Sequence, residues 1–581
     1  MKPIYATLRT STPHRGRVFF VALALSSCTP KTSEPPPKEP TIPVETSVDA
    51  APKSEESDPF DLRGELLSEE QLPLLDGPKP LVSDVPLAAA PKGVPAAPAS
   101  CTKYVSRRPA APLAPATCSD LATALPALAA ALEHPSPDDV DAALAGLEAC
   151  PFDPKTGKGL EPGLVRAVRV ELAPPECGDV LAEPVLTKRP EGMSGSVQHA
   201  LVGLALAARL HRTASSPPEL APPYPKKKVE EFVGKKLFPW FNDQAVAVQE
   251  LSKQGAQLSS YGKGVVALAS GWADLRMVDV LRDAPVPDDF RTDPEKGSVY
   301  FAALDEKLEP RKARGRDAAL VGLREMAAQG VLSDARTTRT RSLLAKLYGG
   351  RRVDGLDVLL VPLGPPPSSS KPLAILARRL PTFYAGRLLE PGAALEPDVF
   401  ASLTSRGVPT PIRASLRART DLARDLVAAY AQFKLTMGVR YWRAVDFDEA
   451  VRLFGQLPAA ERALGIDVSF ATALALRRGP TDVAALMLQP EAIGPKFGDV
   501  RALDRFVDRA RDKPEAGLAA FNAAVVRQIA TPRDADAAYW LNLEKRYAAA
   551  KELLPEPARS EAHERAKAAA ATAKVIQKTE P

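Results

Sequence analysis

The sequence predicts an all-α protein built of stacked helical hairpins, which follow a disordered, proline-rich N-terminal tail. Three observations lead to this prediction. Apolar residues recur at helical spacing through most of residues 101–581, and the joints between these stretches are short and rich in proline. Of the 581 residues, 45% are hydrophobic and 25% charged, as in globular proteins, while 59 are proline. This composition excludes a wholly disordered chain, a collagen and a polytopic membrane protein.

The N-terminus has the features of a signal peptide. A basic stretch precedes the apolar run 18–25, which is far shorter than the roughly twenty residues that span a bilayer. The run ends in Leu25-Ser26-Ser27-Cys28, which resembles the signal of bacterial lipoproteins, where the cysteine receives diacylglycerol before cleavage. The resemblance implies that residues 1–27 are removed and that Cys28 becomes the lipidated first residue. The alternative is an ordinary secretory signal that is cut after Ala24.

The same resemblance implies a location. In lipoproteins an aspartate directly after the lipidated cysteine tends to retain the protein at the inner membrane, and here that position is Thr29. We therefore expect an outer-membrane lipoprotein that is anchored to the bilayer through acylated Cys28 and faces the periplasm. The chain has five cysteines, so lipidation of one leaves four for two disulfides in an oxidising compartment.

Residues 28–100 are expected to form a disordered, acidic linker between the anchor and the folded part. From Thr29 to Ser100 there are 15 prolines, and 6 Lys and Arg stand against 13 Asp and Glu, a net charge of −7. Such a segment cannot bury a core of its own. Between Phe60 and Leu75 apolar residues alternate with acidic ones, so this part either docks into a partner's groove or packs on the protein's own domain.

The first folded unit is predicted to be a disulfide-stapled helical module at residues 101–190. One amphipathic stretch runs to Glu133, and Ser136-Pro137 opens the next with an N-cap and a proline at the first helical position. Two helices joined by a short loop run antiparallel, which brings the start of the first beside the end of the second. We therefore predict a Cys118–Cys150 disulfide, and a Cys101–Cys177 disulfide by elimination, although four cysteines allow three connectivities.

A second helical domain is expected at residues 191–364. The five residues 200–204 recur at 319–323, and each copy carries a glycine inside a predicted helix, which suggests close backbone packing. A loop with three prolines at 365–367 then marks the boundary to a third domain, residues 368–581.

The third domain contains a motif that is similar to the tetratricopeptide repeat. Gly438, Tyr441, Ala450 and Phe454 stand at the 0, +3, +12 and +16 offsets of that repeat. The resemblance covers residues 431–488, one repeat and half of the next, and implies a helix pair whose small residues allow close approach. Lys434 departs from the pattern, which prefers tryptophan there. The alternative is a generic helical hairpin within another kind of helical superhelix.

A basic segment at residues 311–352 has a net charge of +8, whereas the whole chain has +5. Outside the cytoplasm nucleic acid is not an expected ligand, so the candidates are an anionic envelope polymer, an acidic partner or the acidic linker itself. The alternative is an unspecific solvated surface. The candidate anion-binding residues are Arg311, Lys312, Arg314, Arg316, Arg336, Arg339 and Arg341.

We find no catalytic motif and no metal-binding or phosphate-binding motif, and we expect no cofactor and no enzymatic activity. The histidines that follow the signal peptide stand alone, without HExxH or CxxC spacing. The sequence therefore favours a helical interaction or scaffold module for an unidentified envelope protein complex. The alternatives are a binder of peptidoglycan or lipopolysaccharide and, less favoured, a glycan-active enzyme with an unrecognised carboxylate pair.

Overall fold

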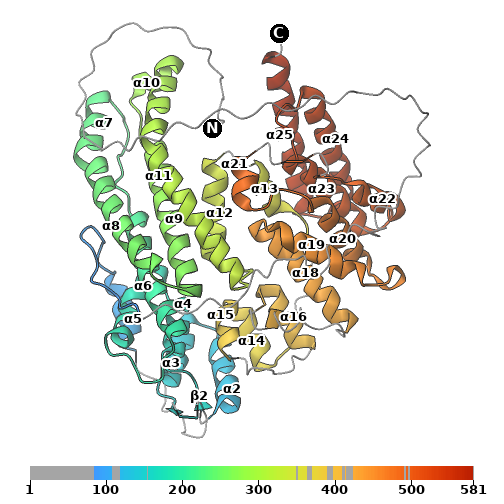
Figure 1. The fold of residues 1–581 in the computed structure, drawn as a ribbon. Coiled ribbons are helices and arrows are strands. Elements are labelled where there is room, and N and C mark those ends of the chain that lie inside the picture. Colours follow the sequence, from blue (N-terminus) through green and yellow to red (C-terminus); the bar gives the residue numbers. More distant parts are fainter. Residues whose placement is uncertain are drawn as a thin grey trace, which may run out of the picture. The chain divides into compact units, whose positions relative to one another are not determined.

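Helices dominate the computed structural model (Figure 1). It describes residues 84–579 except 108–117, 119, 154, 157, 349–350, 363–368, 389–396, 409–411, 414–422, 490–492 and 495–496. In these residues the strands are two short segments, β1 (Phe152–Asp153) and β2 (Lys158–Gly159), which pair antiparallel. The predicted all-α class is therefore confirmed. The signal peptide and Cys28 lie outside the described residues.

The first helices follow the predicted capping signals. They are α1 (Thr102–Val105), α2 (Leu121–Leu132), α3 (Pro137–Leu147), α4 (Leu164–Leu172) and α5 (Gly178–Thr187), with a 3-10 turn at Pro175–Cys177. Asp120 caps α2, and the Ser136 side chain accepts the Asp139 N–H at the start of α3. Because α2 and α3 form an antiparallel hairpin, the start of α2 lies beside the end of α3.

Both predicted disulfides are present. Cys118 and Cys150 join the open end of the α2–α3 hairpin with their Cα atoms 5.6 Å apart. Cys101 and Cys177, whose Cα atoms are 5.2 Å apart, tie the segment before α1 to the turn before α5.

Four long helices form the central part. They are α6 (Gly195–Ser215), α8 (Phe238–Ala256), α9 (Ser260–Arg282) and α11 (Pro294–Ala328), and α9 packs against the other three. A Cβ on Gly203 of α6 would lie 2.6 Å from Gly262 Cα of α9, and a Cβ on Gly322 of α11 would lie 2.6 Å from Leu268 N of α9. The glycines of the two repeated pentapeptides thus allow the close packing that the sequence suggests. The connecting elements are α7 (Lys226–Phe232), a π-helical turn (Val233–Leu237) and α10 (Asp288–Thr292).

The remaining helices fold back and continue as a stack. Helix α14 (Pro372–Arg379) packs against α2, far away in the sequence (Figure 1). The others are α12 (Ala335–Leu347), α13 (Arg351–Val358), α15 (Thr382–Leu388), α16 (Pro397–Arg406), α18 (Arg424–Tyr441), α19 (Ala444–Gly455), α20 (Leu464–Leu476), α21 (Val483–Leu488), α22 (Arg501–Arg509), α23 (Pro514–Ile529), α24 (Ala537–Leu553) and α25 (Ala558–Thr579), with a 3-10 turn at Ala459–Glu461. One hydrophobic core extends from Cys101 to Ala573 and so passes through all three predicted domains. In the part of the chain that the structure describes, no helix has the length and hydrophobicity of a membrane span.

The structure contradicts the prediction of disorder for the last part of the linker. Residues 84–100, blue in Figure 1, pack on the helical body, and Val85 is buried. Arg209 and Arg212 of α6 donate to the carbonyls of Ala88 and Pro95 at 2.7 and 2.8 Å. Gln244 and Gln254 of α8 donate to other carbonyls of this segment. Proline has no N–H, so a proline-rich segment cannot pair its backbone in a regular helix or sheet. Here side chains of the body donate hydrogen bonds to the segment's carbonyls instead.

Candidate functional site

Most of the predicted anion-binding residues, on α11 and α12, form ion pairs with carboxylates of the protein itself. Arg311 and Arg314 both bind Asp274 of α9, at 2.8 and 2.6 Å. Lys312 and Arg316 pair with carboxylates close to them in the sequence, Glu309 and Asp317. Arg341 pairs with Asp357. Neighbouring carboxylates therefore offset the charge at these five positions. Four of these five residues pair with carboxylates outside residues 311–352, namely Asp274, Glu309 and Asp357, which the segment's own charge does not count.

Arg336 lies at the centre of a buried polar junction between four helices. Its Nη2 atom donates to Glu171 Oε1 of α4 at 2.5 Å and to the Tyr261 hydroxyl of α9 at 2.8 Å. It also forms an ion pair with Asp334, which caps α12. Glu171 Oε2 accepts from the hydroxyls of Tyr261 and Tyr384 at 2.9 and 3.1 Å. We call Glu171, Tyr261, Asp334, Arg336 and Tyr384 the polar junction.

Burial and charge in the junction shift the pKa values of both tyrosines and of Asp334. Burial chiefly raises the pKa of Tyr261 and Tyr384 well above the usual value, so both phenols stay protonated and donate to Glu171. Burial works against the charged form of Asp334, but Arg336 outweighs it and lowers the pKa of Asp334. Both carboxylates are thus engaged with Arg336.

Arg339, one turn further along α12, has a different environment. Its guanidinium carbon lies 3.9 Å from the Trp272 ring centroid, and its Nη1 lies 3.2 Å from His211 Nδ1. Its buried Nε has no hydrogen-bond partner. Within the described residues no carboxylate forms an ion pair with this guanidinium, and Asp334 acts on it only from a greater distance. Burial, and then the neighbouring Arg336, lower the pKa of Arg339 to about 10, so it remains a cation at neutral pH.

His211 of α6 is held as a neutral ring. Its ring stacks on Trp272 with centroids 5.4 Å apart. Burial lowers the pKa of His211, and Arg339 and Arg212 lower it further. Because a guanidinium only donates, Nδ1 must accept from Arg339, which places the ring proton on Nε2.

A cavity of about 210 Å³ opens beside these groups. Arg336, Arg339, Glu171, Asp334 and His211 line its polar side. Small and apolar residues of the surrounding helices line the rest: Val170, Ala173, Pro175, Gly178, Leu204, Ala207, Ala208, Ala269 and Ala335. Two of the seven predicted anion-binding residues, Arg336 and Arg339, thus meet at one cavity. The sequence analysis missed His211, Glu171 and Trp272, which come from other helices.

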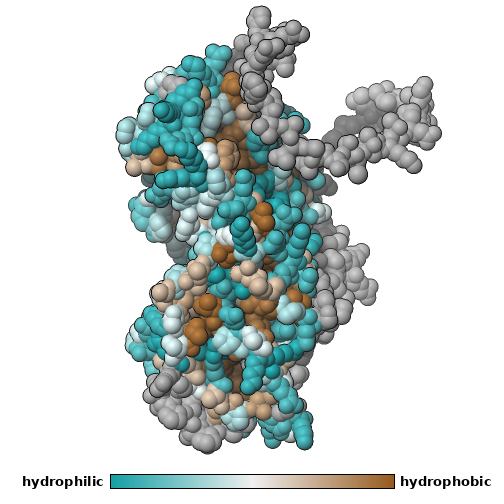
Figure 2. Space-filling model, turned by 90° about the vertical axis from the view of Figure 1, so that its left-hand side faces the viewer, coloured by the Kyte–Doolittle hydropathy of each residue, from teal (hydrophilic) through white to brown (hydrophobic). Residues whose placement is uncertain are grey.

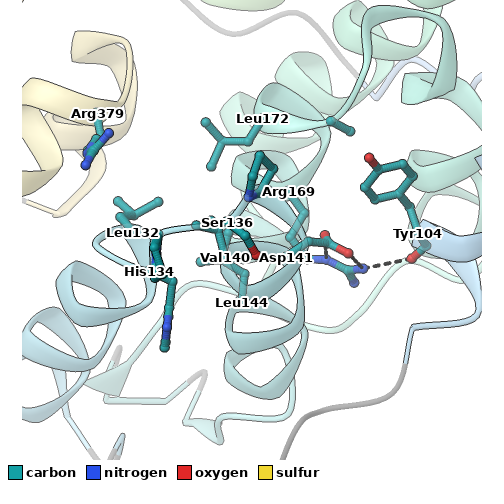
Figure 3. Close-up of a pocket in the computed structure, with 13 residues that line it drawn as sticks. Tyr104, Leu132, His134, Ser136, Val140, Asp141, Leu144, Arg169, Leu172 and Arg379 are labelled. Carbon is teal, nitrogen blue, oxygen red and sulfur yellow. Dashed lines mark hydrogen bonds and ion pairs between the residues drawn. The ribbon is translucent and has the colours of Figure 1, made fainter.

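A second hollow, of about 300 Å³, lies in the disulfide-stapled region (Figure 3). Figure 3 shows the Arg169 guanidinium turned toward Asp141 and the Tyr104 carbonyl, which it binds at 2.8 Å each. Arg379 lies across the hollow on α14. The remaining lining is largely apolar, with Leu132, Val140, Leu144 and Leu172. The polar groups at its base are paired with each other, so this hollow offers a ligand mainly apolar contact.

The residues of the tetratricopeptide-like motif lie in the α18–α19 hairpin. A Cβ on Gly438 would lie 2.6 Å from the Phe447 ring, and Ala450 and Phe454 are fully buried. The Tyr441 hydroxyl donates to the Val331 carbonyl outside the hairpin. These are packing roles.

Lys434, which departs from the repeat pattern, is buried in the same hairpin. Its Nζ lies 2.6 Å from Glu449 Oε2 and 3.4 Å from Asp446 Oδ1. Burial works to lower the pKa of Lys434, but Asp446 and Glu449 outweigh it and hold the pKa above its ordinary value. An internal ion-pair cluster therefore stands where the repeat has tryptophan.

The surface on the side of α7 and α8 is mostly hydrophilic, with hydrophobic side chains in separate patches (Figure 2). The described residues contain no group of three or more His, Cys, Asp or Glu side chains that could hold a metal ion. No family model, curated protein or solved structure matches the chain. The function is therefore argued from the architecture and from the cavity itself.

Proposed function

We propose that the chain is an outer-membrane lipoprotein, anchored through Cys28, whose helical body serves as a non-enzymatic scaffold for an envelope protein complex. The observation that carries the scaffold proposal is the stacking of the C-terminal helices. From α18 to α20, and from α22 to α25, each helix packs on the next one in the sequence. Stacks of this kind present extended surfaces, which helical-repeat proteins use to bind other proteins.

The anchor part of the proposal is supported by the cysteines. Four of the five are paired in the two disulfides, which are typical of proteins in oxidising compartments. The fifth, Cys28, stands in the lipoprotein-like signal, and lipidation would use its thiol.

The alternative of a polymer binder is less well supported. A binder of peptidoglycan or lipopolysaccharide through the basic segment needs exposed, unpaired cations. Arg311, Arg314 and Arg341 are engaged with Asp274 and Asp357 instead. The glycan-active enzyme needs a free carboxylate pair in a cleft, whereas Glu171 and Asp334 at the cavity are held by Arg336.

Two experiments test the proposal separately. For the anchor, full-length protein and the Cys28→Ala variant are expressed in a diderm bacterium, and their membranes are fractionated on a density gradient. We expect the wild type in the outer-membrane fraction and the variant outside it. Recovery of the variant with membranes in the same amount as the wild type would refute the lipid anchor.

For the scaffold, the tagged protein is cross-linked in cells and purified from detergent-solubilised envelopes at low and high salt, with Cys28→Ala as the matched control. We expect a stoichiometric protein partner that survives high salt, because interfaces built on apolar contacts are little affected by screening. Recovery of polymer alone, and only at low salt, would refute the scaffold and favour the polymer binder.

A further inference from the structure

We propose that the cavity beside Arg339 is a binding site for a small organic carboxylate. This inference does not depend on the proposed function. It starts from the ion pairs of the predicted anion-binding residues. Six of the seven have a carboxylate within 4 Å, whereas no described carboxylate forms an ion pair with Arg339. A partly buried guanidinium that lines a cavity is complementary to an anion that enters the cavity.

The guanidinium is held in place before any ligand arrives. Trp272 supports its face, and His211 Nδ1 accepts one of its N–H groups. The stacking of His211 on Trp272 fixes the acceptor in turn. A planar cation whose orientation is set by its neighbours loses little freedom on binding, which favours recognition of a carboxylate.

The charge and volume of the cavity select the class of anion. Glu171, Asp334 and Arg336 also line it and neutralise one another in part, so Arg339 is the one guanidinium of the lining without a paired carboxylate, and a dianion such as phosphate would bring two charges to it. A monoanion is the better match. Because the other walls come from Leu204, Ala207 and similar small apolar residues, the rest of the ligand should be a short apolar group. At roughly 30 Å³ per water, 210 Å³ is the volume of about seven waters, enough for a carboxylate with a few carbons.

The test uses propionate as the probe and saturation-transfer NMR on the full-length protein in detergent, with 1-propanol and inorganic phosphate as comparison ligands. We expect propionate to bind with a Kd on the order of 1 mM, about what five non-hydrogen atoms can supply. Arg339→Gln should weaken binding about tenfold or more, since it removes a charge-assisted contact. Arg316→Gln, which removes a guanidinium of the same basic set paired with Asp317 elsewhere, should change it less than about twofold.

A second variant distinguishes loss of the binding site from loss of folding. Ala207→Met adds volume to the cavity wall and leaves Arg339 and Trp272 in place, so it should abolish binding while the protein melts as before. Propionate binding that is unchanged in both Arg339→Gln and Ala207→Met would overturn the site. So would absence of any propionate signal in the wild type. Binding of 1-propanol or phosphate as tight as that of propionate would overturn the assignment to a carboxylate.

Discussion

Replacing Glu171 by glutamine is expected to destabilise the whole helical body by about 3 kcal/mol. In the structure Glu171 Oε1 accepts from Arg336 at 2.5 Å, and Oε2 accepts from two tyrosine hydroxyls. Removing one partner of a buried ion pair costs about 3–5 kcal/mol, since the other charge stays buried. Arg336 keeps Asp334, and the glutamine oxygen can still accept one bond, so we place the loss at the lower end of this range.

Calorimetry of the wild type and the variant measures this loss. An unfolding entropy of about 2.1 cal/mol/K per residue, over roughly 480 residues, amounts to about 1 kcal/mol/K, so 3 kcal/mol corresponds to a fall in Tm of about 3 °C. Glu183→Gln is the matched control because Glu183 is an exposed residue of α5, and its loss should stay within about 0.5 kcal/mol. Equal Tm values for the two variants would show that the polar junction does not stabilise the fold.

A double-mutant cycle separates the ion pair from packing effects. Arg336→Met alone should also destabilise, because it leaves Glu171 and Asp334 without their cation. If Glu171 and Arg336 interact as the distances indicate, the double variant loses less stability than the two single losses together, by about 1–3 kcal/mol. Strict additivity would refute a direct interaction between the two side chains.

Three further predictions concern other parts of the fold. Cys118→Ser with Cys150→Ser opens a loop of about 33 residues, and loop entropy predicts a loss of about 3.7 kcal/mol, measured by denaturant unfolding; an unchanged midpoint would contradict it. The pKa of His211 is lowered in the folded state, so the unfolded chain takes up the proton first as the pH falls below about 6.5, and stability present at pH 7 declines toward pH 5.5. His211→Gln should show a smaller decline of Tm over this range, and a decline as large as that of the wild type would argue against the neutral ring. Gly322→Ala should destabilise by about 1–3 kcal/mol because its Cβ would meet Leu268 N at 2.6 Å, whereas Gly234→Ala, with no atom within 4 Å, should be neutral or stabilising in the same melts.

The features that the sequence predicts correctly depend on short-range signals. The N-cap at Ser136 and the antiparallel hairpin follow from neighbouring residues, and the Cys118–Cys150 disulfide follows from the hairpin. The glycines at 203 and 322 are likewise marked by their position within helical stretches. In each case the physical cause lies within a few residues or one hairpin of the effect.

In the basic segment, residues 311–352, the ion-pair partners that matter most are distant in the sequence, so short-range signals do not predict them. The sum over residues 311–352 omits Asp274, which lies 37 positions before Arg311, and Glu171, which lies 165 positions before Arg336. Periodicity places these side chains on helices but does not say which helices meet. The cavity depends on the same information, because Arg339, Trp272 and His211 come from three helices that are distant in the sequence.

The proline-rich segment 84–100 departs from its predicted disorder for the same reason. Its composition says that it cannot bury a core of its own, which is correct, but it leaves open whether another core accepts it. The donors that hold it, Arg209 and Arg212, lie on α6, and the same two arginines bind Asp179 of α5. The arginines therefore connect the disulfide-stapled region, the central helices and the incoming chain at one place.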